Sequence, residues 1–454
     1  MKRRQYIIRL FIAVMGWALV CFDQGSLFAE EDTARVISLS ECLKKAVDYS
    51  PTLRTAALEQ QRLKYAKGET MSAGLPQINA NGSFDDYMSL PTSLIPGEFF
   101  NQPGTMIAVQ FGTKYNLSGT IDVSQLLYNQ TYLTSMKLAG MMMNRNELTT
   151  EKFREEVVYN VANLYYLTQA VLAQKENQQK NLARLDTMVI IAGHQYENGL
   201  IRKVDVNRID VNRMNLQTAI DALETIYRQQ LDMLKYYMGL DPSAEIIVPS
   251  NISERLLTPG NNPSVDNHID LQLIRKDKEL AVTGMNMVKA GYLPSLAAYG
   301  RYNYSSQDNT FSFFKKEAEW YEMSLVGIRL DIPLFDGLQK RSKIKQAQVQ
   351  LQELSIQEEE TKKMLAIQLQ NAARKLKSSR DAWVRQTGNV KLAEDVMNVA
   401  SAQYSQGMIT ITEVLTAHAD LGDSQVGMVK AMVEMKNAEL EYLKANGNIL
   451  SVLN

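Results

Sequence analysis

The sequence contains few of the residues from which catalytic and cross-linked sites are usually built. Its 454 residues include only two cysteines, three histidines and three tryptophans. His194, His268 and His418 are far apart in the chain, and no nucleophile elbow, phosphate loop or paired-cysteine motif accompanies them. A lone histidine on a helix is usually a surface or packing residue. We therefore predict a protein that is not an enzyme, with no catalytic, cofactor-binding or metal-binding residues.

An excess of positive charge is also missing, since 49 lysines and arginines face 50 aspartates and glutamates. Nucleic-acid binding normally requires a basic face, so a nucleic-acid partner is not expected. Beyond residue 29, no segment approaches the roughly 18 to 20 consecutive apolar residues of a membrane-spanning helix. If this chain enters a membrane, it must do so with strands.

The N-terminus has the features of a secretory signal peptide over residues 1–29. Lys2, Arg3 and Arg4 open the chain, an apolar segment runs from Leu10 to Phe22, and cleavage is expected after Ala29. Lipidation at Cys21 is a less favoured alternative, because the preceding Val20 is larger than the small residue that this processing prefers. Cys42 is then the only mature cysteine. It cannot form an internal disulfide, and we expect it to pack as a small apolar residue.

The mature chain consists of two copies of one plan. Residues 30–239 and 268–454 are joined by a proline-rich linker at 240–267. The LLYN motif at 126–129 corresponds to LFDG at 334–337, at an offset of 208 residues. The same offset separates QYENGL at 195–200 from QYSQGM at 403–408, which share a Tyr-x-x-Gly signal.

Each copy contains two segments in which apolar and polar residues alternate with a period of two. This pattern predicts strands at about 76–88 and 107–125 in the first copy, and at about 293–305 and 321–334 in the second. A longer loop, LPTSLIPGEFFNQPG at 90–104, is expected between the first two strands. The four strands form two hairpins, each with one apolar face.

Helical periodicity governs most of the remaining chain. Nothing interrupts a helix from about Gln130 to His194, which at 1.5 Å per residue would be roughly 100 Å long. Helical hairpins are predicted to turn at about 196–204 and 404–412, where Gly199 and Gly407 suit the left-handed cap that ends a helix. After the second turn, large residues repeat every seven positions opposite small ones, a pattern typical of a tightly packed antiparallel coiled coil. Both turns should lie side by side at one end.

Four strands cannot hide all their backbone groups from lipid. A sheet in a membrane must close on itself, and membrane barrels begin at eight strands. If these hairpins lie in a membrane, several chains must share one barrel, and three chains would supply about twelve strands. The long helices would continue that barrel as a tube.

The order of these signals resembles the TolC-like outer-membrane efflux family. The matching motifs are LPQINANGSF with LPSLAAYGRY, SQLLYN with PLFDG, and YENGLIRKVDV with YSQGMITITEV, and the resemblance runs from about Ser38 to Leu453. It implies a mainly α fold with a small β contribution, in which a homotrimer forms a twelve-stranded barrel and a helical periplasmic tunnel. It also implies the outer-membrane channel of a tripartite efflux or type I secretion system. Such a channel is a passive duct in outer-membrane lipid, which meets a periplasmic adaptor and an inner-membrane pump of the RND or ABC type.

The resemblance also implies two sets of site residues at the helical turns. The residues that the resemblance assigns to adaptor docking are Gly199, Leu200, Ile201, Gly407, Met408 and Ile409. A periplasmic gate would use Asp205 and Tyr404 as latch residues and Glu413 as part of an acidic ring.

This gate departs from the family pattern at two positions. Ile409 stands where the family has a basic latch residue, and Thr416 where it has a second acidic one, so the gate should be weaker or differently connected. Three copies of Glu413 around an axis would favour cations. A structural interpretation competes with the gate, because carboxylates near helix starts are stabilised by the helix dipole alone and Tyr404 suits a helix seam.

A periplasmic coiled-coil adaptor or structural rod without a barrel is the main alternative. It would explain the heptads and the signal peptide, but not four apolar-faced strands. It would also leave unexplained the aromatic residues near the hairpin loops, which a membrane interface selects. These are Tyr87, Phe99, Phe100, Phe311, Phe313, Phe314, Trp320 and Tyr321. The methionines at helical spacing, such as Met428 and Met435, are expected to fill the core rather than to bind metal.

Overall fold

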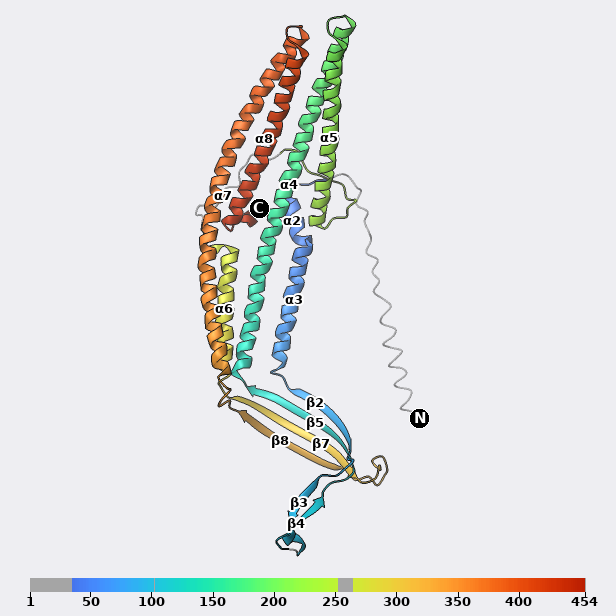
Figure 1. Cartoon of the computed structure of the whole chain (residues 1–454), viewed down its shortest axis with the longest axis vertical. Helices are drawn as coiled ribbons and strands as arrows, with labels where there is room; N and C mark the ends of the chain where they lie inside the picture. The colour runs from blue at the N-terminus through green and yellow to red at the C-terminus, as the bar shows by residue number, and fades with distance from the viewer. Residues whose placement is uncertain (1–34, 102, 252–263, 454) are drawn as a thin grey trace, which may run out of the picture.

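The computed structural model describes residues 35–101, 103–251 and 264–453. The predicted signal peptide, Cys21 and residues 252–263 of the predicted linker lie outside the described residues. Long helices form most of the described chain, and an antiparallel sheet lies at one end of them (Figure 1). The helices of eleven or more residues are α2 (Leu39–Tyr49), α3 (Pro51–Ser72), α4 (Gln130–Glu197), α5 (Lys203–Met238), α6 (Ile269–Ala290), α7 (Gln339–Ser405) and α8 (Ile411–Ala445).

α4 is as long as the sequence predicts, and α7 has nearly the same length. α4 has 68 residues and α7 has 67, so each spans roughly 100 Å at 1.5 Å per residue. α4 begins where the side chain of Asn129 accepts a hydrogen bond from the Tyr132 amide at 3.0 Å, a normal N-cap. α4 packs against α5 and α7 against α8, which gives two helical hairpins whose turns lie at the end remote from the sheet (Figure 1).

The main sheet has four antiparallel strands in the order β2-β5-β7-β8. They are β2 (Gln77–Asp86), β5 (Tyr115–Tyr128), β7 (Ser295–Asp308) and β8 (Tyr321–Asp331). β5 and β7, from the two halves of the chain, pair along the centre, so β2 and β8 are the edge strands. β8 ends two residues before Pro333, which has no amide hydrogen to donate to a sheet.

The sequence-based prediction was wrong between residues 90 and 114. The predicted loop at 90–104 contains a strand, β3 (Thr92–Pro96), and a 3₁₀ turn, η1 (Gly97–Phe100). β3 pairs with β4 (Met106–Gln110) as a separate two-stranded hairpin. The strand predicted at 107–125 is therefore divided between β4 and β5. The chain changes direction at Gly112, whose φ of 112° is disfavoured for other residues.

The register of the main sheet gives it one apolar and one polar face. Ile78 pairs with Val123 and Ala298 pairs with Ile328, all on the apolar face. The opposite face carries polar residues that bond across strands. There, Arg301 Nε donates to Asp122 Oδ1 at 2.6 Å, Asn303 donates to Thr120 at 2.8 Å, and Ser83 bonds to Ser118 at 2.8 Å.

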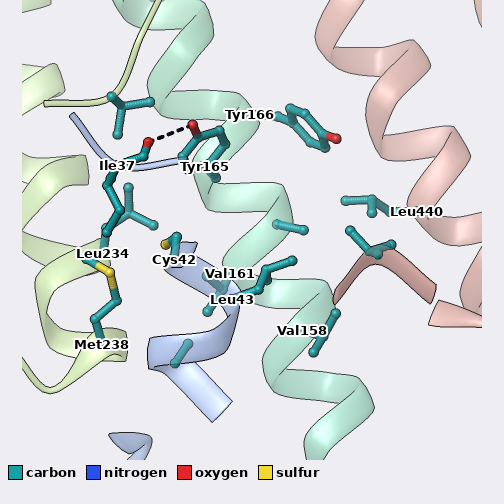
Figure 2. Packing of buried hydrophobic residues seen from close by; sticks show 14 of the residues in the cluster. Ile37, Cys42, Leu43, Val158, Val161, Tyr165, Tyr166, Leu234, Met238 and Leu440 are labelled. Atoms are coloured by element: carbon teal, nitrogen blue, oxygen red, sulfur yellow. Dashed lines mark hydrogen bonds between the residues drawn. The ribbon is translucent and has the colours of Figure 1, made fainter. Parts of the chain in front are cut away.

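A buried cluster near the middle of the molecule, which we call the mid-body cluster, joins residues before and within α2 to α4, α5, α8 and η3 (Ile449–Leu453). α2 packs between α4 and α5 there, with Cys42 and Leu43 fully buried (Figure 2). The Tyr165 hydroxyl donates to the Ile37 carbonyl at 3.0 Å, which ties the segment before α2 to α4. Burial raises the pKa of the Cys42 thiol to about 12, so this thiol stays neutral. Cys42 and the seam residue Met435 are therefore packing residues, as the sequence predicts.

The predicted linker also contains structure. Within its described part, β6 (Ile246–Ile247) pairs in parallel with β1 (Arg35–Val36), and η2 (Val265–Asn267) precedes α6. Throughout the described ranges, no helix has both the length and the apolar character required to cross a membrane.

Candidate functional site

The two helical hairpins turn with the same backbone geometry. In the first tip, residues 198–202, the Gly199 amide donates to the Tyr196 carbonyl at 2.9 Å and the Leu200 amide to the Gln195 carbonyl at 2.8 Å. Gly199 has a φ of 73°, in the left-handed region. This pair of bonds is the Schellman motif, which satisfies the last carbonyls of α4. Its left-handed residue is usually glycine, because a residue without a Cβ adopts that conformation with little strain.

The second tip, residues 406–410, repeats these bonds at the end of α7. The Gly407 amide donates to the Tyr404 carbonyl at 2.9 Å, and the Met408 amide donates to the Gln403 carbonyl at 2.9 Å. Gly407 has a φ of 74°. The Tyr-x-x-Gly signal is therefore a helix-stop signal at both positions, as the sequence predicts.

The two tips are joined by a buried tip cluster. Its members come from α4, α5, α7 and α8, and Arg208 of α5 donates to the Thr412 hydroxyl of α8 at 3.1 Å. The predicted side-by-side position of the tips is confirmed by these contacts (Figure 1). The tip cluster consists of Leu185, Met188, Ala192, Ile209, Met397, Ala400, Tyr404, Ile411, Val414, Ala417 and Leu421.

The six predicted docking residues differ in their exposure. The side chains of Leu200 and Met408 are among the exposed large apolar ones, at 73% and 61%. Ile201 and Ile409 instead pack against the tip cluster. Each tip thus has one apolar side chain directed into solvent and one that anchors the turn.

Asp205 and Tyr404 lie near each other, although they come from different hairpins. The Tyr404 side chain is 4% exposed, and its hydroxyl is buried without a hydrogen-bond partner among the described residues. Burial raises the pKa of Tyr404, and the negative charge of Asp205 raises it further. The hydroxyl is therefore a donor without an acceptor, close to a carboxylate that could accept.

Glu413 is placed differently from this pair. It occupies the position of α8 that corresponds to Asp205 in α5, three residues after the N-cap. Its side chain is exposed and accepts a hydrogen bond from the Thr410 hydroxyl at 3.0 Å. Thr410 also accepts from the Glu413 amide at 3.5 Å, so Thr410 is a side-chain N-cap of α8.

Two arginines beside Asp205 were missed by the sequence-based prediction. Arg202 Nε lies 3.4 Å and Arg208 Nη1 4.0 Å from the Asp205 carboxylate, whose side chain is 14% exposed. Ile409 brings no charge to this site, so the nearby cations come from α5 and its N-cap residue. The spacing of three residues on either side of Asp205 is a signal that could have identified them.

Polar contacts below the tip cluster hold the hairpins together. Asn181 of α4 donates to Gln425 of α8 at 2.8 Å, and the ring of His418 lies 3.3 Å from the Asn181 carbonyl. Burial lowers the pKa of His418, which favours the neutral ring. Arg184 pairs with Glu394 of α7 at 3.2 Å. Among the described residues, no group of three or more histidine, cysteine or acidic side chains is placed to hold a metal ion.

Comparison with known proteins places this architecture in a family. Residues 42–240 and 264–448 match the family described as outer membrane efflux protein. The outer membrane protein TolC of Vibrio cholerae serotype O1 is 21% identical over 423 residues, which cover 91% of each chain. The outer membrane protein TolC of Salmonella enteritidis is 23% identical over 354 residues, or 73% of this chain and 68% of the relative.

Solved structures show the same fold at lower identity. The CusC channel superposes with a TM-score of 0.72 at 16% identity, covering 90% of this chain and 92% of CusC. The open-state MtrE outer membrane channel of Neisseria gonorrhoeae has a TM-score of 0.70 at 14% identity, covering 91% and 89%. The matched residues include the strands as well as both hairpins, so a coiled-coil rod alone does not account for them. The chain belongs to the outer membrane efflux protein family, and its place is the outer membrane.

Proposed function

We propose that three copies of this chain form a passive duct through the outer membrane, the exit channel of a tripartite efflux or type I secretion system. The observation that carries this proposal is the main sheet, whose two edge strands are open along ten and eleven residues. Open edges of this length attract further strands. Three four-stranded sheets joined edge to edge would close a barrel of about twelve strands, which leaves no backbone group unpaired in lipid.

The two faces of the sheet support the same arrangement. The apolar face, with Ile78, Val123 and Ile328, would contact lipid, and the polar face, with Asp122 and Arg301, would line the lumen. The helical hairpins would extend the lumen through the periplasm as a tunnel. Because the chain supplies only the duct, the choice of solute would rest with the inner-membrane pump, of the RND or ABC type.

The tips would be the docking surface for a periplasmic adaptor. Leu200 and Met408 extend into solvent beside glycines whose backbone is uncovered. Ile201 and Ile409 would act indirectly, by anchoring these two turns to the tip cluster. An adaptor with an apolar hairpin tip of its own would bury both exposed side chains at once.

The closed gate would depend on Asp205 and Tyr404. A small inward movement of α7 would bring the unpaired Tyr404 hydroxyl to the Asp205 carboxylate, and Arg202 and Arg208 would hold that carboxylate in place. Glu413, exposed and free of arginine contacts among the described residues, would instead give the entrance a negative potential that favours cations.

Single-channel recording in a planar bilayer tests the duct and the gate together. The wild-type trimer is expected to show a low closed-state conductance. Asp205→Asn and Tyr404→Phe should raise it, while Glu413→Gln should reduce cation preference. Asp221→Asn, an exposed acidic residue farther along α5, is the matched control and should change neither property. An unchanged closed-state conductance in Asp205→Asn and Tyr404→Phe would refute the gate, and a monomer without conductance would refute the duct.

A further inference from the structure

A cavity of about 390 Å³ lies where the sheet meets the helices. It is bounded by the connection from β8 to α7, by the first turns of α7 and by Tyr292 after α6. Leu334, Phe335 and Ile344 supply apolar walls, and Lys340, Arg341 and Lys345 supply a basic rim. The same cavity therefore offers apolar surface and positive charge within a few residues of each other.

Basic residues are concentrated at this cavity, although acidic and basic residues are nearly equal in number over the whole chain. Residues 339–345 of α7 contain four basic and no acidic residues, and the next acidic residue along this helix is Glu353. Lys340 is paired with Asp336 at 3.2 Å. Among the described residues, no carboxylate lies within ion-pair distance of Arg341 or Lys345, and both are exposed. Two cations at the rim are thus available to an external anion.

An apolar stripe leads along β8 to the cavity. Val326, Ile328 and Leu330 share the apolar face of the sheet, since they pair with Gly300, Ala298 and Leu296 of β7. Ile332 and Leu334 continue the two-residue spacing beyond the strand. Val326 is 90% and Leu334 is 92% exposed, so the stripe is uncovered along its length.

We propose that this cavity binds the headgroup of an anionic phospholipid from the periplasmic leaflet, with an acyl chain lying along the β8 stripe. The inference rests on the proposed function, because it requires the apolar face of the sheet to be in the membrane. The stripe then ends at the depth where hydrocarbon gives way to headgroups. Basic side chains at that depth attract anionic lipids, and long basic side chains extend readily to the interface.

The charge of a neighbouring copy strengthens this choice of occupant. If β2 of the next copy joins β8, its α3 comes beside α7, and the end of α3 near the sheet carries Lys64 and Lys67 with one acidic residue, Glu69. Both facing segments would then carry a net positive charge, and like charges repel unless an anion lies between them. A phosphate diester would satisfy both sides, whereas a bare protein contact would not.

Native mass spectrometry of the detergent-solubilised full-length trimer tests the proposal. The probe is phosphatidylglycerol, titrated into wild type and into the double variant Arg341→Gln/Lys345→Gln. About one phosphatidylglycerol should be retained per wild-type chain. The variant should bind it about tenfold more weakly, since each rim cation attracts the headgroup. Phosphatidylcholine should show little difference between the two proteins, and millimolar inorganic phosphate should not displace the lipid.

The double variant Lys377→Gln/Arg380→Gln is the matched control. It removes two exposed basic residues from the same helix, far from the sheet, and should retain phosphatidylglycerol as wild type does. Equal retention by wild type and Arg341→Gln/Lys345→Gln overturns the inference, as does displacement by inorganic phosphate. If the trimer conducts and this result is obtained, only the lipid site is wrong. If neither trimer nor conductance is found, the proposed function itself is wrong.

Discussion

The two tips have almost identical backbones but very different side-chain environments. Both end a helix of nearly the same length with a Schellman turn at a glycine of φ close to 74°. Yet Tyr196 is 45% exposed, whereas Tyr404, the equivalent residue, is buried in the tip cluster. The first tip places its acidic residue between two arginines, and the second places its own against the hydroxyl of the N-cap threonine.

This difference shows which properties a repeated sequence signal determines. Tyr-x-x-Gly fixes where a helix stops, because the constraint lies in the backbone of one glycine. It does not fix what the tyrosine does, because burial depends on which neighbouring helix covers it. α8 packs against both α4 and α7. Tyr404 of α7 is therefore covered by neighbouring helices, whereas Tyr196 of α4 remains exposed.

The largest effect expected from this asymmetry is on the stability of the tips. Tyr404→Ala removes a buried ring and should lower the free energy of local opening by about 3 kcal/mol, a usual value for a large aromatic residue in a core. Tyr196→Ala should change it by less than about 0.5 kcal/mol. Hydrogen exchange of the amides in α7, α8 and the turns, read by mass spectrometry, measures both. Similar losses of protection in the two variants would contradict the asymmetry.

The mid-body differs from the tips in that a buried carboxylate there, Glu155, lies near a lysine, Lys444, rather than between two arginines. Burial, and next the charge of Asp270, raise the pKa of Glu155 to about 7, while Lys444 lowers it. This folded-state pKa is above the ordinary value of 4.5, so the folded chain holds the proton more tightly. Stability therefore falls as pH rises from about 4.5 to about 7, and stays at that lower level above it.

Glu155→Gln should consequently stabilise the protein by roughly 1–3 kcal/mol at pH 8 and change little at pH 5. The apparent melting temperature of the solubilised protein at the two pH values gives the measurement. Glu147→Gln, an exposed residue about two turns earlier in α4, is the control and should show no such pH dependence. If Glu155→Gln stabilises the protein equally at both pH values, then packing or charge repulsion, rather than the protonation of Glu155, limits stability here.

The sequence was sufficient for features that depend on local periodicity or on one residue type. The length of α4, the alternating faces of the strands and the two glycine turns all follow from such patterns. It was insufficient between residues 90 and 114, where a short hairpin breaks from the sheet. There, the apolar alternation of β4 continues toward β5, and only the turn at Gly112 separates them.

The candidate site was predictable in part, and for the same reason. The turns were identified from glycine and helix spacing, but the proximity of Asp205 and Tyr404 depends on the packing of two hairpins that are about 200 residues apart in the chain. Arg208 was missed because its contact with Thr412 crosses that same interface. Its role could be inferred only from its spacing to Asp205.

The shared backbone of the two tips gives a prediction of equal effects. Gly199→Ala and Gly407→Ala should each destabilise their turn by about 1–2 kcal/mol, the penalty of a Cβ in the left-handed region. No atom lies within 4 Å of a Cβ added at either glycine, so no clash should distinguish them. Hydrogen exchange of the Leu200 and Met408 amides reports each turn. If the two variants lose different amounts of exchange protection, the two turns are strained to different degrees despite their matching φ values.

The smallest effect expected is at the starts of α5 and α8, where the tips differ in their caps. Thr410 accepts from the Glu413 amide, whereas the Arg202 side chain has no acceptor to offer at the equivalent position of α5. Thr410→Ala should therefore destabilise the first turn of α8 by about 1 kcal/mol, and Arg202→Ala should change that of α5 by only a few tenths. Exchange rates in the two first turns provide the measurement, with Thr410→Ser as the variant that keeps the cap. If Thr410→Ser is as damaging as Thr410→Ala, the methyl group rather than the hydroxyl stabilises this start, and the two tips are more alike than their hydrogen bonds indicate.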